Sequence, residues 1–129
     1  MAEVVTNHEL AILVTNPKKY DQGMVGSYTT YKLTTHTTLD FFDGITEFSV
    51  ERRYSDFSWL RGRLVHYYPK LKVPALPEKT LMGVFSPEFI EARRYHLEQF
   101  LALCVEQPRI RQDSTFHTFL AADTEKMAR

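Results

Sequence analysis

The feature that most constrains the fold is a change of hydrophobic period near the middle of the chain. Residues 45–54, ITEFSVERRY, alternate between two side-chain parities, which is typical of a half-buried β-strand. Ser55 and Asp56 follow, and either can cap the start of a helix. Apolar residues then recur at helical spacing: Phe57, Leu60, Leu64 and Tyr67. The sequence therefore predicts a strand that passes directly into a helix.

Two further strands are expected before this junction. Residues 10–14, LAILV, form a short apolar run that Asn16 and Pro17 are expected to end. Residues 27–39 are dense in Thr and Tyr, which suit a pleated, half-buried surface. Asp43 and Gly44 mark a tight turn before the third strand. Three strands with short connections favour an antiparallel meander.

Helices are expected to fill the rest of the chain. Residues 69–79, PKLKVPALPEK, contain three prolines and no helical period, so they predict an extended connection. Ser86, Pro87 and Glu88 are typical of a helix start, and Pro108 ends that helix after Gln107. Its expected buried face comprises Phe89, Ile90, Leu97, Phe100, Leu101 and Cys104, and a last short helix carries Phe116, Phe119 and Leu120. The predicted fold class is α+β: a three-stranded antiparallel β-meander packed on a helical subdomain, with a proline-rich loop between the first and second long helices.

Composition limits the classes of function. The chain has 129 residues, of which 43% are hydrophobic, enough for one domain with one core. Lys plus Arg number 16 and equal Asp plus Glu, so a protein that coats nucleic acid is disfavoured and anion recognition must be local. The single cysteine, Cys104, allows no internal disulfide and is expected to be a buried thiol in a reducing, cytosolic setting. Since we find neither a signal-peptide pattern nor a long apolar run, we expect any membrane to be met from the water side.

The sequence offers little support for catalysis. The five histidines are scattered without metal-ligand spacing, and no G-x-S-x-G or phosphate-cradling glycine loop occurs. Asp56 lies beside Ser55 and Ser58, but a helix cap explains this cluster more simply than a catalytic triad does. We therefore expect a protein that is not an enzyme and has no cofactor or metal site. The segment VPALP, residues 73–77, also matches a minimal PxxP ligand of SH3-type domains.

Cations gather at the junctions between the predicted elements. Arg52 and Arg53 end the third strand, Lys79 ends the proline segment, and Arg93 and Arg94 lie near the start of the long helix. Each could be a solvated surface charge when taken alone. Three separate segments that each offer cations at a junction favour one shared pocket for an anion.

Three motifs carry a resemblance to a known family. RRYSDF followed by WL, then VPALPEK, then FSPEFIEARRYHLEQFL resemble the phox-homology (PX) domain of the sorting nexin family, in order and in approximate spacing. The resemblance covers residues 10–123 and leaves residues 1–9 and 124–129 as tails. It implies the fold predicted above. It also implies binding of phosphatidylinositol 3-phosphate, without metal or cofactor.

The resemblance assigns roles to individual residues. It implies that Arg53 grips the 3-phosphate, for which a guanidinium offers a planar fork of donors. Tyr54 is the aromatic floor under the inositol ring, and Lys79 meets the 1-phosphate. Arg93 hydrogen-bonds the 4- and 5-hydroxyls, although the adjacent Arg94 could hold that role. Arg52 then supports the sheet or pairs with an acid.

A hydrophobic loop adjoins these residues. Leu81, Met82, Val84 and Phe85 cluster around Gly83. The resemblance implies that this loop inserts into the bilayer beside the pocket. The alternative is a turn that packs onto the core.

The resemblance thus implies a phosphoinositide-binding, membrane-targeting module for the sorting of membrane proteins. It would be peripheral on the cytosolic face of early endosomes, with other trafficking or coat proteins as partners and no nucleic acid. The alternative is a PX-type protein–protein interaction module with weak or altered lipid specificity. A further possibility is another lipid ligand, a 3,5-bisphosphate or a 4-phosphorylated phosphoinositide.

Overall fold

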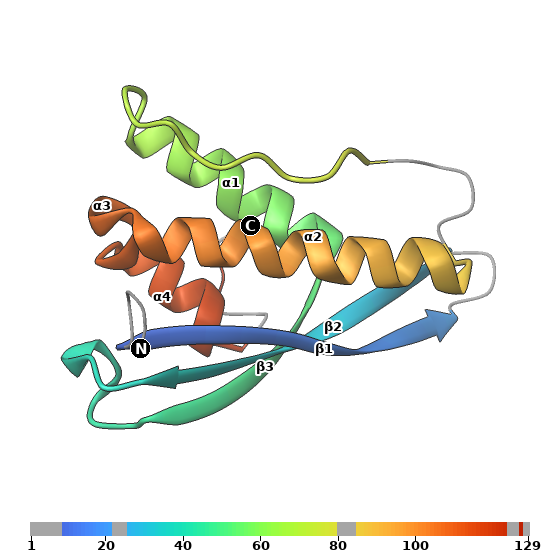
Figure 1. The fold of residues 1–129 in the computed structure, drawn as a ribbon, viewed down its shortest axis with the longest axis horizontal. Coiled ribbons are helices and arrows are strands. Elements are labelled where there is room, and N and C mark those ends of the chain that lie inside the picture. The colour runs from blue at the N-terminus through green and yellow to red at the C-terminus, as the bar shows by residue number, and fades with distance from the viewer. Residues whose placement is uncertain (1–8, 22–25, 80–84, 124–126, 128–129) are drawn as a thin grey trace, which may run out of the picture.

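The computed structural model describes residues 9–21, 26–79, 85–123 and 127. Three strands form one antiparallel sheet in the order β1-β2-β3, and the α-helices lie together on one side of it (Figure 1). In chain order the elements are β1 (Leu10–Asp21), β2 (Ser27–Thr37), the 3-10 helix η2 (Asp40–Phe42), β3 (Glu47–Arg53), α1 (Tyr54–Tyr67), α2 (Pro87–Glu106), α3 (Pro108–Arg111) and α4 (Ser114–Ala121). The predicted α+β meander with a helical layer is confirmed.

Strand β1 is longer than the sequence predicted. It continues past Asn16 and Pro17 to Asp21, so the prediction that these two residues end the strand is wrong. The β1–β2 register shifts between Thr15 and Lys18, and Asn16 has a left-handed backbone with φ 52°. The irregularity places the proline, which lacks an N–H, where the ladder needs no donor. Pairing with β2 then resumes and extends the sheet by four residue pairs, from Lys18 to Asp21.

The predicted turn between the second and third strands is present. Asp43 and Gly44 both have positive φ, 56° and 79°. The Ile45 N–H donates to the Phe42 carbonyl oxygen at 3.0 Å. Asp and Gly tolerate this backbone better than most residues, which explains their presence here.

Helix α1 begins earlier than predicted. Its first residue is Tyr54, and Arg53 is at the N-cap position, so the prediction of Ser55 or Asp56 at the helix start is wrong. The Asp56 carboxylate acts from within the first turn, where it accepts the Arg53 backbone N–H at 2.8 Å. Tyr67 is 47% exposed, so the buried face of α1 ends at Leu64 rather than at Tyr67. The strand therefore passes into the helix without any linker.

Helix α2 begins as predicted. The Ser86 hydroxyl accepts the Phe89 backbone N–H at 3.2 Å, and Pro87 is the first helical residue. The helix ends at Glu106, just before Pro108. Residues 72–79 before it contain neither helix nor strand, as the prolines predicted.

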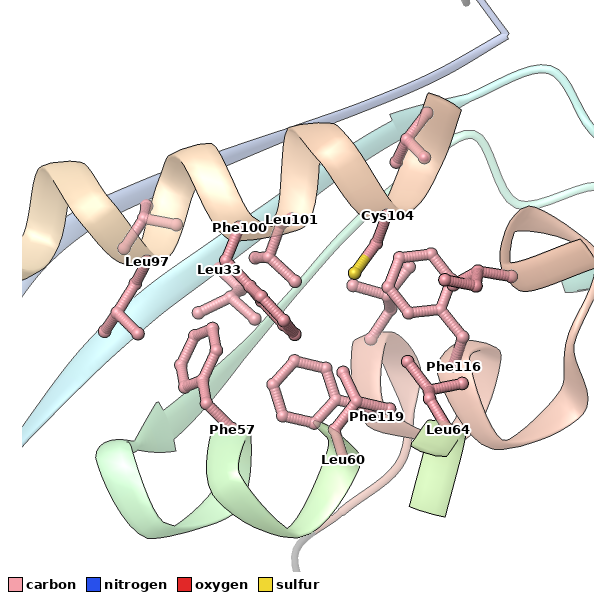
Figure 2. Packing of buried hydrophobic residues seen from close by; sticks show 14 of the residues in the cluster. Leu33, Phe57, Leu60, Leu64, Leu97, Phe100, Leu101, Cys104, Phe116 and Phe119 are labelled. Atoms are coloured by element: carbon pink, nitrogen blue, oxygen red, sulfur yellow. The ribbon is translucent and has the colours of Figure 1, made fainter. Parts of the chain in front are cut away.

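The core lies between the sheet and the helices (Figure 2). Phe57 of α1 makes edge contacts with Phe100 of α2 and Phe119 of α4, at centroid distances of 6.3 and 5.0 Å. Cys104 is also buried there, and burial raises the pKa of its thiol to about 12. The thiol is therefore protonated at neutral pH and packs as an apolar group, in agreement with the sequence prediction.

A buried arginine joins the end of the sheet to the last helix. Arg52 is only 1% exposed, and its Nε–H donates to the Phe119 carbonyl oxygen at 2.9 Å. The Nη2 and Nη1 groups donate to the carbonyl oxygens of Ala122 and Glu51. The carbonyl groups at a helix C-terminus carry partial negative charge, so a cation is favoured at this end of α4. Arg52 thus supports the fold, as expected.

We predict that Arg52→Gln lowers the free energy of unfolding by about 3 kcal/mol, because buried carbonyl groups lose charged donors. Urea denaturation measures this change. The neighbouring Arg53→Gln variant is the matched control and should stay within about 1 kcal/mol of the wild type, since it loses only a partly exposed contact with the Tyr28 ring. Equal effects of the two substitutions would contradict the structural role of Arg52.

Candidate functional site

A cavity of about 290 Å³ lies where the ends of several elements meet. Its walls come from β2, the junction of β3 with α1, the end of the proline segment and the first turns of α2. The lining residues are Ser27, Tyr28, Thr29, Tyr31, Arg53, Tyr54, Ser55, Ser58, Lys79, Phe85, Phe89 and Arg93. The structure therefore brings together all four predicted headgroup residues: Arg53, Tyr54, Lys79 and Arg93.

Arg53 lies at the end of β3 and is partly exposed. Strand alternation turns it away from the buried side chain of Arg52. Its guanidinium carbon is 3.8 Å from the centroid of the Tyr28 ring. Within the described ranges its side chain makes no hydrogen bond or ion pair. Its N–H donors are therefore available to an anion in the cavity.

Arg93 is almost buried, with 9% exposure. Its guanidinium carbon lies 4.0 Å from the Tyr54 ring centroid and 4.6 Å from that of Phe89, and its Nη2 donates to the Glu78 carbonyl oxygen at 2.8 Å. The buried Nε has no hydrogen-bond partner among the described residues. Burial lowers the pKa of Arg93. An incompletely satisfied, desolvated cation in a cavity is typical of a ligand-binding group.

Arg94 faces another direction. Its Nη1 donates to the Val14 carbonyl oxygen at 2.9 Å, and its side chain also pairs with Glu91 and Glu98. The Glu98 carboxylate accepts the Val14 backbone N–H at 2.9 Å. Arg94 and Glu98 thus attach α2 to the outer edge of β1. Of the two adjacent arginines, Arg93 lines the cavity and Arg94 holds the helix in place.

The proline segment is fixed by side chains from the two long helices. The Tyr54 hydroxyl donates to the Pro77 carbonyl oxygen at 2.6 Å, and Arg61 Nε donates to that of Pro74 at 2.7 Å. Together with the contact of Arg93 at Glu78, these bonds set the path of the chain up to Lys79, which is exposed at the cavity. The same bonds occupy carbonyl groups of the PxxP motif and disfavour its use as an SH3-type ligand.

The combination of these features matches a known family. A family model described as PX domain matches residues 42–123. The chain belongs to the PX domain family. Sorting nexin PX domains are phosphoinositide-binding modules of membrane trafficking, peripheral on membranes and typically non-enzymatic.

Relatives and solved structures agree with this assignment. The PX domain is 43% identical over 122 residues to "Sorting nexin 1" of Arabidopsis thaliana, and the aligned region covers 93% of this chain and 30% of that protein. It is 42% identical over 118 residues to human "Sorting nexin-30", and this aligned region covers 88% of this chain and 26% of that protein. This chain therefore spans less than a third of the length of these relatives.

Two solved structures share the fold. An X-ray structure of a designed CISK-PX domain has a TM-score of 0.72 at 31% identity, over 86% of this chain and 98% of that one. The cryo-EM structure of the SNX-BAR Mvp1 tetramer has a TM-score of 0.73 at 29% identity, over 87% of this chain and 31% of that one.

The sequence pattern did not predict the contribution of β2 to the cavity of this PX domain. Ser27, Tyr28 and Thr29 line it, although they precede the motifs by many residues. The register of the sheet brings them there, since Thr30 of β2 pairs with Arg53 of β3. The Thr- and Tyr-rich composition predicted a strand but contained no signal for this register.

The predicted membrane loop falls largely outside the described residues. Leu81, Met82 and Val84 lie in that gap. Phe85 is described, is 38% exposed and lines the cavity. The Lys19 Nζ lies 4.5 Å from its ring centroid. Among the described residues, no helix has the length and apolar character needed to cross a bilayer, and no cluster of potential metal ligands occurs.

We predict opposite stability effects for the two arginines of α2. Arg93→Met should leave the free energy of unfolding unchanged or raise it by up to about 1 kcal/mol, because a desolvated charge is replaced by an apolar side chain. Arg94→Met should lower it by about 1 kcal/mol, since it removes the bond to Val14. Thermal and urea unfolding of both variants measure the difference, and the reverse order would contradict the assignment.

Proposed function

We propose that this PX domain binds phosphatidylinositol 3-phosphate and recruits a larger trafficking protein to the cytosolic face of early endosomes. The observation that carries the proposal is the convergence of Arg53, Lys79 and Arg93, from three distant segments, on one cavity. We assign the binding unit to residues 10–123, with residues 1–9 and 124–129 as tails. Recognition uses charge-assisted hydrogen bonds and involves no chemical step.

The 3-phosphate is assigned to Arg53. A guanidinium has donors in a planar fork that fits two phosphate oxygens, and it stays charged at any physiological pH. The side-chain donors of Arg53 have no acceptor within the described residues, so binding requires no internal bond to break. A phosphate bound at this position replaces hydrogen bonds to water with two hydrogen bonds from the guanidinium of Arg53.

The other contacts suit the rest of the headgroup. Lys79 is exposed at the rim and carries a flexible point charge, which suits the 1-phosphate that links the headgroup to the lipid. Arg93 lies deeper, and its Nε–H, which has no partner in the described part of the chain, is a donor for the inositol hydroxyls. Tyr54 supplies an aromatic face for the C–H side of the ring. A neutral hydroxyl beside Arg93 is preferred to a further phosphate because the apolar ring of Phe89 also lines the cavity there.

Bilayer insertion by residues 81–85 would add affinity. Burial of one Leu or Phe side chain contributes roughly 1.5–3 kcal/mol. Nearby cations on an anionic leaflet contribute about 1 kcal/mol each. The exposed ring of Phe85 at the cavity, close to Lys19, supports this part of the proposal. Leu81, Met82 and Val84 are assigned to the same insertion.

We predict that Arg53→Gln abolishes sedimentation with vesicles that contain phosphatidylinositol 3-phosphate, because the bidentate phosphate contact is lost. The thermal midpoint should stay close to that of the wild type, since the side chain of Arg53 makes no hydrogen bond to any residue that the structure describes. A panel of vesicles with 3-, 4-, 5- and 3,5-phosphorylated lipids identifies the preferred ligand. Retained binding by the variant would refute the assignment. Wild-type binding to none of the lipids would favour a protein-interaction module instead.

A negative charge at Ser55 should weaken lipid binding. Ser55 is exposed, lines the cavity and follows Tyr54 directly. We predict that Ser55→Glu reduces vesicle binding at least tenfold, because the carboxylate repels the phosphates of the ligand. Ser114→Glu is the control, since Ser114 is exposed at the start of α4 outside the cavity. Equal binding by the two variants would contradict an effect of local charge.

A further inference from the structure

Arg53 is the end of a stack that continues across two strands. Its guanidinium carbon lies 3.8 Å from the Tyr28 ring centroid. The Tyr28 ring stacks on that of Tyr20, with a centroid distance of 5.3 Å and an angle of 13° between the planes. The Lys18 Nζ lies 5.0 Å from the Tyr20 ring centroid. A cation, two parallel rings and a second cation thus follow one another.

The register of the sheet builds this stack. Tyr20 of β1 is paired with Tyr28 of β2, and Thr30 of β2 is paired with Arg53 of β3. Tyr28 is therefore the diagonal neighbour of Arg53, two residues from its direct partner and on the same face of the sheet. Long and aromatic side chains reach each other across such a diagonal.

Hydrogen bonds hold the Tyr20 end of the stack in place. The Tyr20 hydroxyl donates to the Glu51 carboxylate at 2.9 Å, and Thr30 Oγ1 donates to the same oxygen at 3.0 Å. Tyr20 therefore gives Tyr28 a fixed surface to pack on. The Tyr28 hydroxyl has no hydrogen bond within the described parts of the chain. Tyr28 therefore contacts Tyr20 and Arg53 through its ring alone.

The orientation of Arg53 depends on this ring. Arg93 is held by a carbonyl group and two rings, whereas the side chain of Arg53 has no hydrogen bond or ion pair within the described ranges. The donors of a guanidinium lie in its plane. A ring on one face fixes that plane and leaves the N–H groups at its edge free for a phosphate.

We propose that Tyr28 is a positioning residue that holds the guanidinium plane of Arg53 for bidentate phosphate binding. The inference rests on the proposed function, since Arg53 is the assigned phosphate ligand. Tyr28 acts through Arg53 and needs no contact of its own with the lipid. Its ring is required and its hydroxyl is not.

Two substitutions of Tyr28 test the proposal on vesicles with and without phosphatidylinositol 3-phosphate. Tyr28→Phe keeps the ring and should bind within about twofold of the wild type. Tyr28→Leu keeps an apolar side chain but no π-face, and its affinity should fall about threefold to thirtyfold, the range of one cation–π contact. Thermal unfolding checks that both variants are folded. The loss in Tyr28→Leu should persist at temperatures where that variant is fully folded.

A nuclear magnetic resonance measurement reports the stacking without any lipid. The Arg53 Nε–H signal, assigned by its absence in Arg53→Gln, should be shifted upfield by the ring in the wild type and in Tyr28→Phe. In Tyr28→Leu it should move toward the position of a free arginine. An unshifted wild-type signal would overturn the proposal.

The variants also separate this inference from the proposed function. If Arg53→Gln loses binding while Tyr28→Leu binds like the wild type, the phosphate assignment stands and the positioning role is refuted. A loss of affinity in Tyr28→Phe equal to that in Tyr28→Leu would refute the role of the ring. If Arg53→Gln binds like the wild type, the proposed function fails and the positioning role fails with it.

Discussion

The bonds of Arg52 to the last helix are the constraint on which the pocket depends. A strand turns successive side chains to opposite faces, so Arg52 and Arg53 cannot both face the core. Arg52 is buried against the C-terminal carbonyl groups of α4, which fixes the end of β3. Arg53 is then held at the opposite face, and Tyr54 begins α1 at the rim of the cavity. One buried cation thereby sets the position of two residues that line the cavity.

The same division of roles recurs on α2. Neighbouring residues of a helix point about 100° apart, so Arg94 can hold the edge of β1 while Arg93 faces the cavity. Arg93 is nearly buried and leaves its Nε without a partner among the described residues. Such an arrangement costs stability in the absence of a ligand, which is expected where function rather than folding selects a residue. In both pairs, one arginine stabilises the fold and its neighbour is available to an anion.

Local pattern was sufficient to predict the elements of this PX domain but not how they pair. Alternation and helical spacing predicted β3, α1 and α2, because burial of one face is a local property of the sequence. The extension of β1 past Pro17 was missed, since pairing with β2 outweighs a local turn signal. The start of α1 was misplaced because Asp56 stabilises the first turn from inside it. Tyr28 was overlooked because its place beside Arg53 follows from the register of two strand pairs.

The choice between Arg93 and Arg94 likewise could not be made from local sequence pattern. The resemblance to sorting nexins pointed to Arg93 and left Arg94 as an alternative. The contact of Arg94 with the backbone of Val14, a residue 80 positions away in sequence, and the presence of Arg93 in the cavity lining separate the two. The order of motifs along the chain thus predicted which segments meet. The distances decided which side chain of each segment faces the cavity.

The proposed arrangement places cations from three segments around a single headgroup. A titration of the isotope-labelled protein with short-chain phosphatidylinositol 3-phosphate, followed by nuclear magnetic resonance, tests it most directly. Signals of Arg53, Tyr54, Lys79 and Arg93 should shift together along one saturation curve, while those of Arg52 and Arg94 should change little. Shifts confined to another surface, or separate curves for the three cations, would contradict it.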